Sequence, residues 1–202
     1  MSLHSFKEHY LVEAAAETVT LNWGRFNPPT IGHEKLLDVS HSKGSGDHRI
    51  YATQTSGDKK NPLEWKTKIK YMRKVFPVHA RMILMDKKVK TIFDALVIAH
   101  NDGYKKLELV VGSDRVTEFD TLVKKYNGKK GKHGLYDFKE ITIINAGERD
   151  PDAEGADGMS ASKMRAAASN NDLVAFTQGL PKKFRDAEGL MNAVRSGMGL
   201  KE

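Results

Sequence analysis

Cysteine is absent from the 202 residues of this chain. The absence excludes a disulfide framework and a thiolate-bound zinc site, and it fits a reducing compartment. The chain also has no apolar run near the roughly 18 to 20 residues that a membrane-spanning helix needs. Its first residues lack the apolar core of a secretory signal. We therefore expect a soluble, cytoplasmic protein with no membrane partner.

Acidic residues are in deficit, with 33 Lys+Arg against 26 Asp+Glu and a net charge of +7. This balance favours contact with polyanions. Five lysines gather around two glycines, which predicts a mobile basic loop: Lys124, Lys125, Lys129, Lys130 and Lys132. Non-specific binding of nucleic acid is one interpretation. A solvated basic surface is the other, since no helix-turn-helix or zinc-finger pattern accompanies the lysines.

Apolar, β-branched segments alternate with segments of helical periodicity along most of the chain. The predicted strands cover residues 18–23, 49–54, 81–85, 106–111 and 138–144. Strands separated by helices predict an α/β, Rossmann-like fold in which a parallel sheet of about five strands carries helices on both faces. In such sheets ligands bind outside the carboxyl ends of the strands.

The length of the chain suits one domain of ordinary size. We predict an N-terminal peptide at residues 1–16, a catalytic domain at residues 17–180 and a C-terminal helical tail at residues 181–202. Glycines within the tail predict a marginal or docked helix.

One stretch, residues 24–33, joins the first predicted strand to the first predicted helix. Pro28 and Pro29 end the strand, and the helix begins near Thr30. A helix N-terminus offers unpaired N–H groups and the positive end of the helix dipole, which suit a phosphate. Thr30 and His33 are three residues apart, so both side chains are expected on one face of the first turn, directed at one anion.

The sequence Gly-Arg-Phe-Asn-Pro-Pro-Thr-Ile-Gly-His at residues 24–33 resembles the signature of the nucleotidyltransferase superfamily with a His-x-Gly-His or Thr-x-Gly-His motif. A second element, Met-Ser-Ala-Ser-Lys-Met-Arg at residues 159–165, resembles that superfamily's Ile-Ser-x-Thr-x-Ile-Arg motif. The resemblance implies transfer of a nucleoside monophosphate from a nucleoside triphosphate to an acceptor, with release of pyrophosphate. It implies catalytic roles for His33, Thr30, Arg165, Arg25 and Ser162, and nucleotide contacts from Gly24, Phe26, Asn27 and Ser160.

Two further segments supply candidate ligand contacts. Residues 61–69 resemble the Asn-Pro-Phe-Thr-x-x-Glu-Arg-Ile segment of archaeal-type nicotinamide mononucleotide adenylyltransferases, with Lys68 in place of an arginine that reaches the triphosphate. In that segment Asn61 and Trp65 are candidate acceptor contacts, although a half-buried Trp65 that only covers the core is as plausible. Gly112 and Asp114 follow a predicted strand and are expected to line the nucleotide site. The alternative is that Ser113 or Asp114 caps the next helix. The resemblance also implies Mg²⁺, which arrives with the triphosphate and needs no dedicated protein site.

The sequence leaves alternatives open for the identity of the acceptor substrate and for whether the protein is an enzyme. The first motif and the 61–69 segment favour transfer of AMP from ATP to nicotinamide mononucleotide, Thr30 favours a phosphopantetheine adenylyltransferase, and a cytidylyltransferase is a further alternative. Residues 5–14 resemble head-targeting peptides of large tailed phages, which are cut after Leu-x-Glu, so the resemblance implies removal of residues 1–13. This second resemblance implies a protein of the host cytoplasm or the phage head. It allows a non-catalytic basic protein that binds nucleotide or DNA inside the head. The acidic loop at residues 145–158 is a candidate lid or magnesium contact.

Overall fold

The computed structural model describes residues 17–147 and 159–200. Four parallel strands form one sheet in the order β2-β1-β3-β4. Their bounds are β1 (Thr18–Gly24), β2 (Asp47–Ala52), β3 (Lys106–Val111) and β4 (Glu140–Asn145). The strand order reverses beside β1, so the carboxyl ends of β1 and β3 flank a crevice of the kind that binds ligands. The predicted α/β, Rossmann-like class is confirmed, with four strands where about five were expected.

The segment at residues 81–85 accounts for the missing strand. Ile83 makes a single parallel bridge with Ile50 on β2. Ile50 donates its N–H to the carbonyl of Met82 and accepts from the N–H of Leu84, both at 2.9 Å. The Arg73 guanidinium binds the Ile83 carbonyl at 2.7 Å, on the outer side. The segment therefore lies where a fifth strand would lie, but a side chain covers its outer edge, and the prediction of a full strand is wrong.

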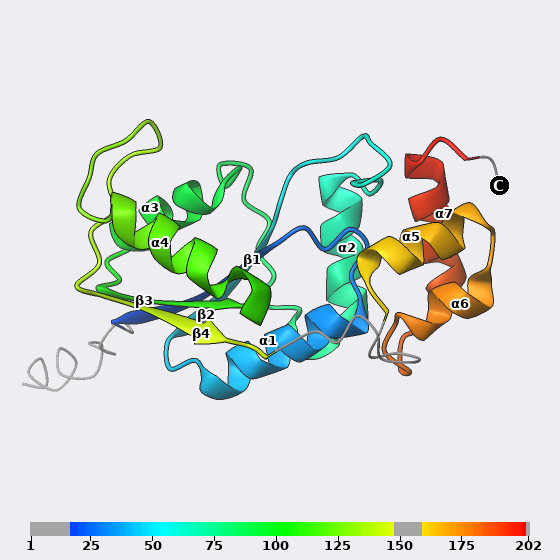
Figure 1. Cartoon of the computed structure of the whole chain (residues 1–202), viewed down its shortest axis with the longest axis horizontal. Coiled ribbons are helices and arrows are strands. Elements are labelled where there is room, and N and C mark those ends of the chain that lie inside the picture. The colour runs from blue at the N-terminus through cyan, green and yellow to red at the C-terminus, as the bar shows by residue number, and fades with distance from the viewer. Residues whose placement is uncertain (1–16, 148–158, 201–202) are drawn as a thin grey trace, which may run out of the picture.

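Helices cover both faces of the sheet (Figure 1). The helices α3 (Ile92–Asn101) and α4 (Val116–Tyr126) lie on one face, and α1 (Ile31–Lys43) lies on the other. The side chain of Thr91 accepts a hydrogen bond from the N–H of Asp94, and the Asp94 carboxylate accepts from the N–H of Thr91. Thr91 and Asp94 thus form a reciprocal capping box. The face under α3 and α4 is apolar, with buried side chains from three strands and both helices.

Polar side chains lie on the face of the sheet under α1. Thr20 on β1 donates a 2.6 Å hydrogen bond to Glu108 on β3, and Ser40 of α1 donates a 2.8 Å bond to Asn22. Burial alone would raise the pKa of Glu108, but hydrogen bonds from Ser45 and Thr20 bring that pKa below its usual value. These bonds fix α1 and the loop that follows it to the two central strands.

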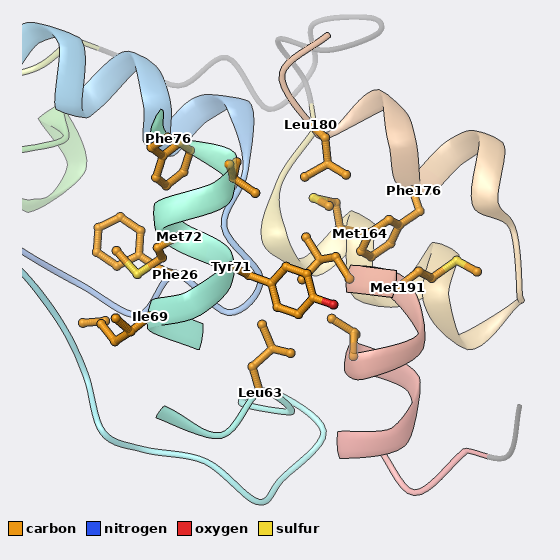
Figure 2. Packing of buried hydrophobic residues seen from close by; sticks show 14 of the residues in the cluster. Phe26, Leu63, Ile69, Tyr71, Met72, Phe76, Met164, Phe176, Leu180 and Met191 are labelled. Atoms are coloured by element: carbon orange, nitrogen blue, oxygen red, sulfur yellow. The ribbon is translucent and has the colours of Figure 1, made fainter. Parts of the chain in front are cut away.

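A second apolar cluster joins the remaining helices (Figure 2). These helices are α2 (Trp65–Val75), α5 (Ala161–Ser169), α6 (Leu173–Gln178) and α7 (Ala187–Gly197), and short 3-10 turns cover Pro77–His79 and Ser113–Arg115. Tyr71 of α2, Met164 of α5 and Met191 of α7 converge in the cluster. The described part of the C-terminal segment is therefore built into the core that holds α2 and α5. The predicted N-terminal peptide lies outside the described residues.

Gly197 of α7 lies directly against the backbone before α2, because a Cβ atom on it would overlap the carbonyl oxygen of Pro62. We expect Gly197→Ala to lower the free energy of unfolding by about 1 to 3 kcal/mol, measured by urea denaturation. This loss exceeds the roughly 1 kcal/mol by which alanine favours a helix. Gly131→Ala is the control, since a Cβ there meets nothing within 4 Å. Equal effects of the two substitutions would contradict the contact.

Candidate functional site

The loop between β1 and α1 holds an unusual backbone conformation. Phe26 has a φ of 46°, in the left-handed region that bulky residues rarely occupy, and the next peptide bond, Asn27–Pro28, is cis. The Phe26 side chain is 2% exposed, and its ring centroid lies 4.8 Å from that of His33. A Cβ on Gly24 would lie 2.7 Å from the Phe26 ring, so glycine permits this fold-back. A bulky residue that its surroundings hold at positive φ is typical of ligand sites.

Thr30 and His33 form a capping box at the start of α1. The Thr30 N–H donates to His33 Nδ1 at 3.0 Å, and the His33 N–H donates to Thr30 Oγ1 at 3.3 Å. Because Nδ1 accepts a backbone hydrogen bond, the neutral imidazole carries its proton on Nε2. Thr30 is fully buried. The structure therefore places Thr30 as the residue that orients the imidazole, whereas the sequence suggested that both side chains face the anion.

More of the backbone N–H groups at the start of α1 are hydrogen-bonded within the protein than the sequence predicted. The N–H groups of Thr30 and His33 serve the capping box. The N–H of Ile31 donates to the carbonyl of Gly179, at the end of α6, at 2.8 Å. The prediction of unpaired N–H groups is wrong for these three residues, and an anion here must be bound largely by side chains.

The second motif touches the first. Ser160 caps α5 and accepts from the Lys163 N–H at 3.1 Å. Arg165, one turn into α5, donates to the Asn27 carbonyl at 2.8 Å and to Ser162 Oγ at 2.9 Å. The first of these bonds joins residues 138 positions apart in the sequence. The two motifs therefore meet in space at the loop that also positions His33.

A second guanidinium lies near Arg165. Burial lowers the pKa of Arg165, the positive charge of Arg25 lowers it further, and Asp58 acts in the opposite direction. Arg25 itself is exposed. Two like charges on adjacent segments repel each other until an anion lies between them. The pair is suited to the phosphates of a polyanionic ligand, which arginine binds through two parallel hydrogen bonds.

Asn27 connects this loop to the segment before α2. Its side chain is 2% exposed. Asn27 Oδ1 accepts from the Leu63 N–H at 2.9 Å, and Nδ2 donates to the Leu63 carbonyl at 3.4 Å. The sequence placed Asn27 among the nucleotide contacts. The structure instead directs its side chain to Leu63 and its carbonyl to Arg165, so Asn27 is the residue on which the two halves of the site are joined.

The two candidate acceptor residues lie in the loop before α2 and at the first position of that helix. The Asp58 carboxylate accepts from the N–H groups of Lys60 and Asn61, at 2.7 and 2.8 Å, and from Asn61 Nδ2. Asn61 is 9% exposed, and its Oδ1 has no hydrogen-bond partner among the described residues. Trp65 begins α2 and is half-buried against the second cluster. Asn61 Oδ1 is thus a buried acceptor atom without a hydrogen-bond partner among the described residues. Asp58, in the same loop, is close enough to Arg165 for its negative charge to act on the pKa of that arginine.

Lys68 is fully buried, and its ammonium donates to the carbonyls of Thr53, at 2.8 Å, and Thr55, at 3.3 Å. The sequence suggested a contact with the triphosphate. In the structure the ammonium instead fixes the chain that leaves β2. Burial lowers its pKa to about 8, because the charged form is poorly solvated there.

The buried ammonium makes stability depend on pH. Between pH 8, near the folded pKa of Lys68, and pH 10.5, near its unfolded value, the unfolded chain binds more protons than the folded chain. The free energy of unfolding should therefore rise with pH across this window, relative to Lys68→Met, by at most about 1.4 kcal/mol per pH unit. Urea denaturation of both proteins at several pH values measures the difference. Lys70→Met, at an exposed position of the same helix, is the control: the difference in free energy of unfolding between the wild type and this variant should not change with pH. A difference between the wild type and Lys68→Met that also stays constant with pH would contradict the assignment.

Gly112 and Asp114 follow β3 at the crevice beside β1. A Cβ on Gly112 would lie 2.9 Å from Asp114 Oδ1, so glycine lets the turn close. Asp114 is exposed in the 3-10 turn. The residue that precedes α4 is Arg115, which makes no side-chain cap. The alternative prediction that Ser113 or Asp114 caps α4 is therefore wrong.

Clusters of metal-ligating side chains are missing from residues 17–147 and 159–200. Within these ranges no three His, Asp or Glu side chains are grouped so that they could hold a metal ion. Most of the predicted acidic loop lies outside the described residues. Over the same part of the chain, no helix has the length and apolar character needed to cross a bilayer.

The sheet order, the helices on both faces and the strand-to-helix loop define an α/β, Rossmann-like fold. A solved structure with this fold is the bifunctional NMN adenylyltransferase/ADP ribose pyrophosphatase from Francisella tularensis. It matches with a TM-score of 0.57 and 12% sequence identity, over 90% of this chain and 52% of the other, so this chain spans about half the length of that protein. No family model and no curated protein matches the sequence. At this identity the likeness shows the fold.

Proposed function

We propose that this protein is a nucleotidyltransferase that moves AMP from ATP to nicotinamide mononucleotide and releases pyrophosphate. The observation that carries the proposal is the contact of Arg165 with the Asn27 carbonyl. That contact brings the second motif to the loop that carries Arg25 and positions His33. These contacts support a single phosphate-binding place to which two guanidinium groups and an imidazole, from two distant segments, would contribute.

The reaction needs positioning and charge neutralisation and no covalent intermediate on the protein. A phosphate oxygen of the acceptor attacks the α-phosphorus of ATP in line, and the bond from that phosphorus to the oxygen of the leaving pyrophosphate breaks. His33 donates from Nε2 to a phosphate oxygen as negative charge develops there, and Thr30 holds the ring in that orientation. Arg25 and Arg165 neutralise the β and γ phosphates. Mg²⁺ enters as part of the Mg–ATP substrate and screens the triphosphate.

The remaining site residues fit the rest of the nucleotide. Ser160 and Ser162 lie at the start of α5, where hydroxyls and helix N–H groups bind anions. Gly24 and Gly112 lie at the carboxyl ends of the adjacent strands β1 and β3. In this proposal the ribose binds beside these strand ends, with Asp114 as an exposed acceptor for a hydroxyl.

The acceptor site is proposed at Asn61 and Trp65. The unpartnered Oδ1 of Asn61 needs a donor, and the carboxamide of nicotinamide supplies an N–H. A nicotinamide ring also offers a flat face to the Trp65 indole. The name of the Francisella protein includes the same acceptor. These features support nicotinamide mononucleotide over phosphopantetheine, which has amide N–H groups but no ring.

The test is pyrophosphate release by the purified chain, with each nucleoside triphosphate paired with nicotinamide mononucleotide, phosphopantetheine and a set of sugar and alcohol phosphates. We expect ATP with nicotinamide mononucleotide to give the highest rate and NAD as the product. Release with CTP and an alcohol phosphate would identify a cytidylyltransferase instead. No release with any pair would overturn the enzymatic proposal and favour the non-catalytic alternative.

A further inference from the structure

A strongly basic surface lies on the segment that joins α4 to β4. Residues 124–139 contain six lysines and one aspartate. Lys124 pairs with Asp120 at 2.5 Å, whereas the other five lysines form no ion pair within the described part of the chain. In Figure 1 this segment lies at the end of the molecule opposite α5, α6 and α7. It is therefore distant from the proposed catalytic site.

The loop is held by hydrogen bonds, which corrects the prediction of a mobile basic loop. The Gly128 N–H donates to the Tyr136 carbonyl at 2.9 Å, and Gly131 bridges Gly134. The side chain of Asn127 donates to and accepts from the backbone of Phe138, at 3.0 and 2.9 Å. The lysines thus extend from a fixed turn, which reduces the entropy lost when they bind an extended ligand.

Aromatic rings lie beside these lysines. Tyr126 is 41% exposed, and Lys125 Nζ lies 5.6 Å from its ring centroid. Phe93 of α3 contacts the Tyr126 ring edge to face at 5.4 Å, and His133 stacks on Phe93 at 5.7 Å. His133 Nδ1 also contacts Asp94 Oδ1 at 2.9 Å, which ties the basic loop to α3. An exposed aromatic ring among cations is the combination that single-stranded nucleic acids recognise.

We propose that this surface binds single-stranded nucleic acid, independently of the catalytic site. Lys125, Lys129, Lys130 and Lys132 would contact backbone phosphates, and Tyr126 would stack on one base. Three acids bear on the surface: Asp120 pairs with Lys124, Asp94 is engaged by His133, and Asp137 lies beside Gly128. Single-stranded nucleic acid fits better than an acidic peptide or an anionic membrane, because it presents a flat base with every phosphate, whereas a peptide has a ring only at its aromatic residues and a lipid headgroup surface has none.

The test is fluorescence anisotropy of the full chain with a labelled thymidine oligonucleotide and with a duplex of equal length, at several salt concentrations. We expect the wild-type chain to bind the single strand with a dissociation constant of about 10⁻⁴ to 10⁻⁶ M near physiological salt. Lys129→Gln/Lys130→Gln should weaken binding and reduce the salt slope by about 1.4, roughly 0.7 for each phosphate that a lysine no longer neutralises. Tyr126→Ala should weaken binding to the single strand several-fold and leave duplex binding almost unchanged.

The matched control is Lys182→Gln/Lys183→Gln, another adjacent pair of exposed lysines, on the segment between α6 and α7. We expect it to bind like the wild-type chain. Equal weakening in both double variants would overturn the location. Duplex binding tighter than single-strand binding, or binding to phosphatidylserine vesicles without binding to the oligonucleotide, would overturn the choice of ligand. Pyrophosphate release by Lys129→Gln/Lys130→Gln should match the wild-type rate, so this test is independent of the catalytic proposal.

Discussion

His33→Ala should lower kcat for pyrophosphate release by about 10² to 10³, by analogy with the loss of one preorganised oxyanion donor. Its Nδ1 accepts the Thr30 N–H at 3.0 Å, so Nε2 carries the proton that is offered to a phosphate oxygen. This hydrogen bond should strengthen as charge develops in the transition state. The loss should therefore appear in kcat more than in KM, and steady-state kinetics with ATP varied separates the two.

The same substitution removes part of the α1 capping box, and we expect it to lower the free energy of unfolding by about 1 kcal/mol. Activity must therefore be measured below the unfolding transition, with circular dichroism as the check of folding. His41→Ala is the matched control, because His41 is an exposed residue near the end of the same helix. It should retain the parental rate. A folded His33→Ala protein that also transfers nucleotide at the parental rate would remove the imidazole from the mechanism.

Arg165→Lys is the second substitution with a large expected effect. Lysine keeps the charge but cannot hold the Asn27 carbonyl and Ser162 Oγ while gripping phosphate, because it lacks the planar fork of arginine. We expect kcat/KM for ATP to fall about 10²-fold, which corresponds to about 2.7 kcal/mol. Arg165→Ala should lose about 10³-fold, since it also removes the charge.

Inorganic pyrophosphate provides a readout that does not depend on turnover. Its affinity, measured by calorimetry, should fall in parallel with kcat/KM in both Arg165 variants if the guanidinium binds the β and γ phosphates. Arg185→Lys, at an exposed position between α6 and α7, is the control and should leave both quantities unchanged. Unaltered pyrophosphate affinity in Arg165→Lys would show that this arginine serves the fold and not the ligand.

Local sequence patterns predicted most of the architecture. The period-2 and period-3.6 patterns located all four observed strands to within a few residues, because apolar side chains of every strand are at least partly buried against the cores. The segment at residues 81–85 has the same composition as a strand. Whether it extends the sheet depends on pairing with β2, a strand distant in the sequence, and only Ile83 makes a bridge there, to Ile50. Composition alone does not carry that information.

The sequence predicted which residues lie at the candidate site more completely than it predicted their orientations and contacts. The motifs identified Arg165 and His33. Thr30 and Lys68, however, are fully buried, so their side chains support the site and do not face a ligand directly. Burial is a property of the folded chain, so spacing could not reveal it. Asp58 was not singled out, although the Asp-x-x-Asn pattern with Asn61 is typical of a side chain that caps its own turn. This Asp-x-x-Asn pattern is sufficient to predict that Asp58 holds the turn.

The double role of Asn27 has a thermodynamic consequence. Its carbonyl holds Arg165, which is proposed to bind the triphosphate, and its amide holds Leu63, two residues beyond Asn61 in the proposed acceptor loop. A phosphate bound to the same guanidinium would change the strength of its hydrogen bond to that carbonyl and so alter the restraint on the neighbouring loop. The affinities for donor and acceptor are then coupled through one peptide unit, and such coupling is reciprocal: whichever substrate binds first changes the affinity for the other by the same factor.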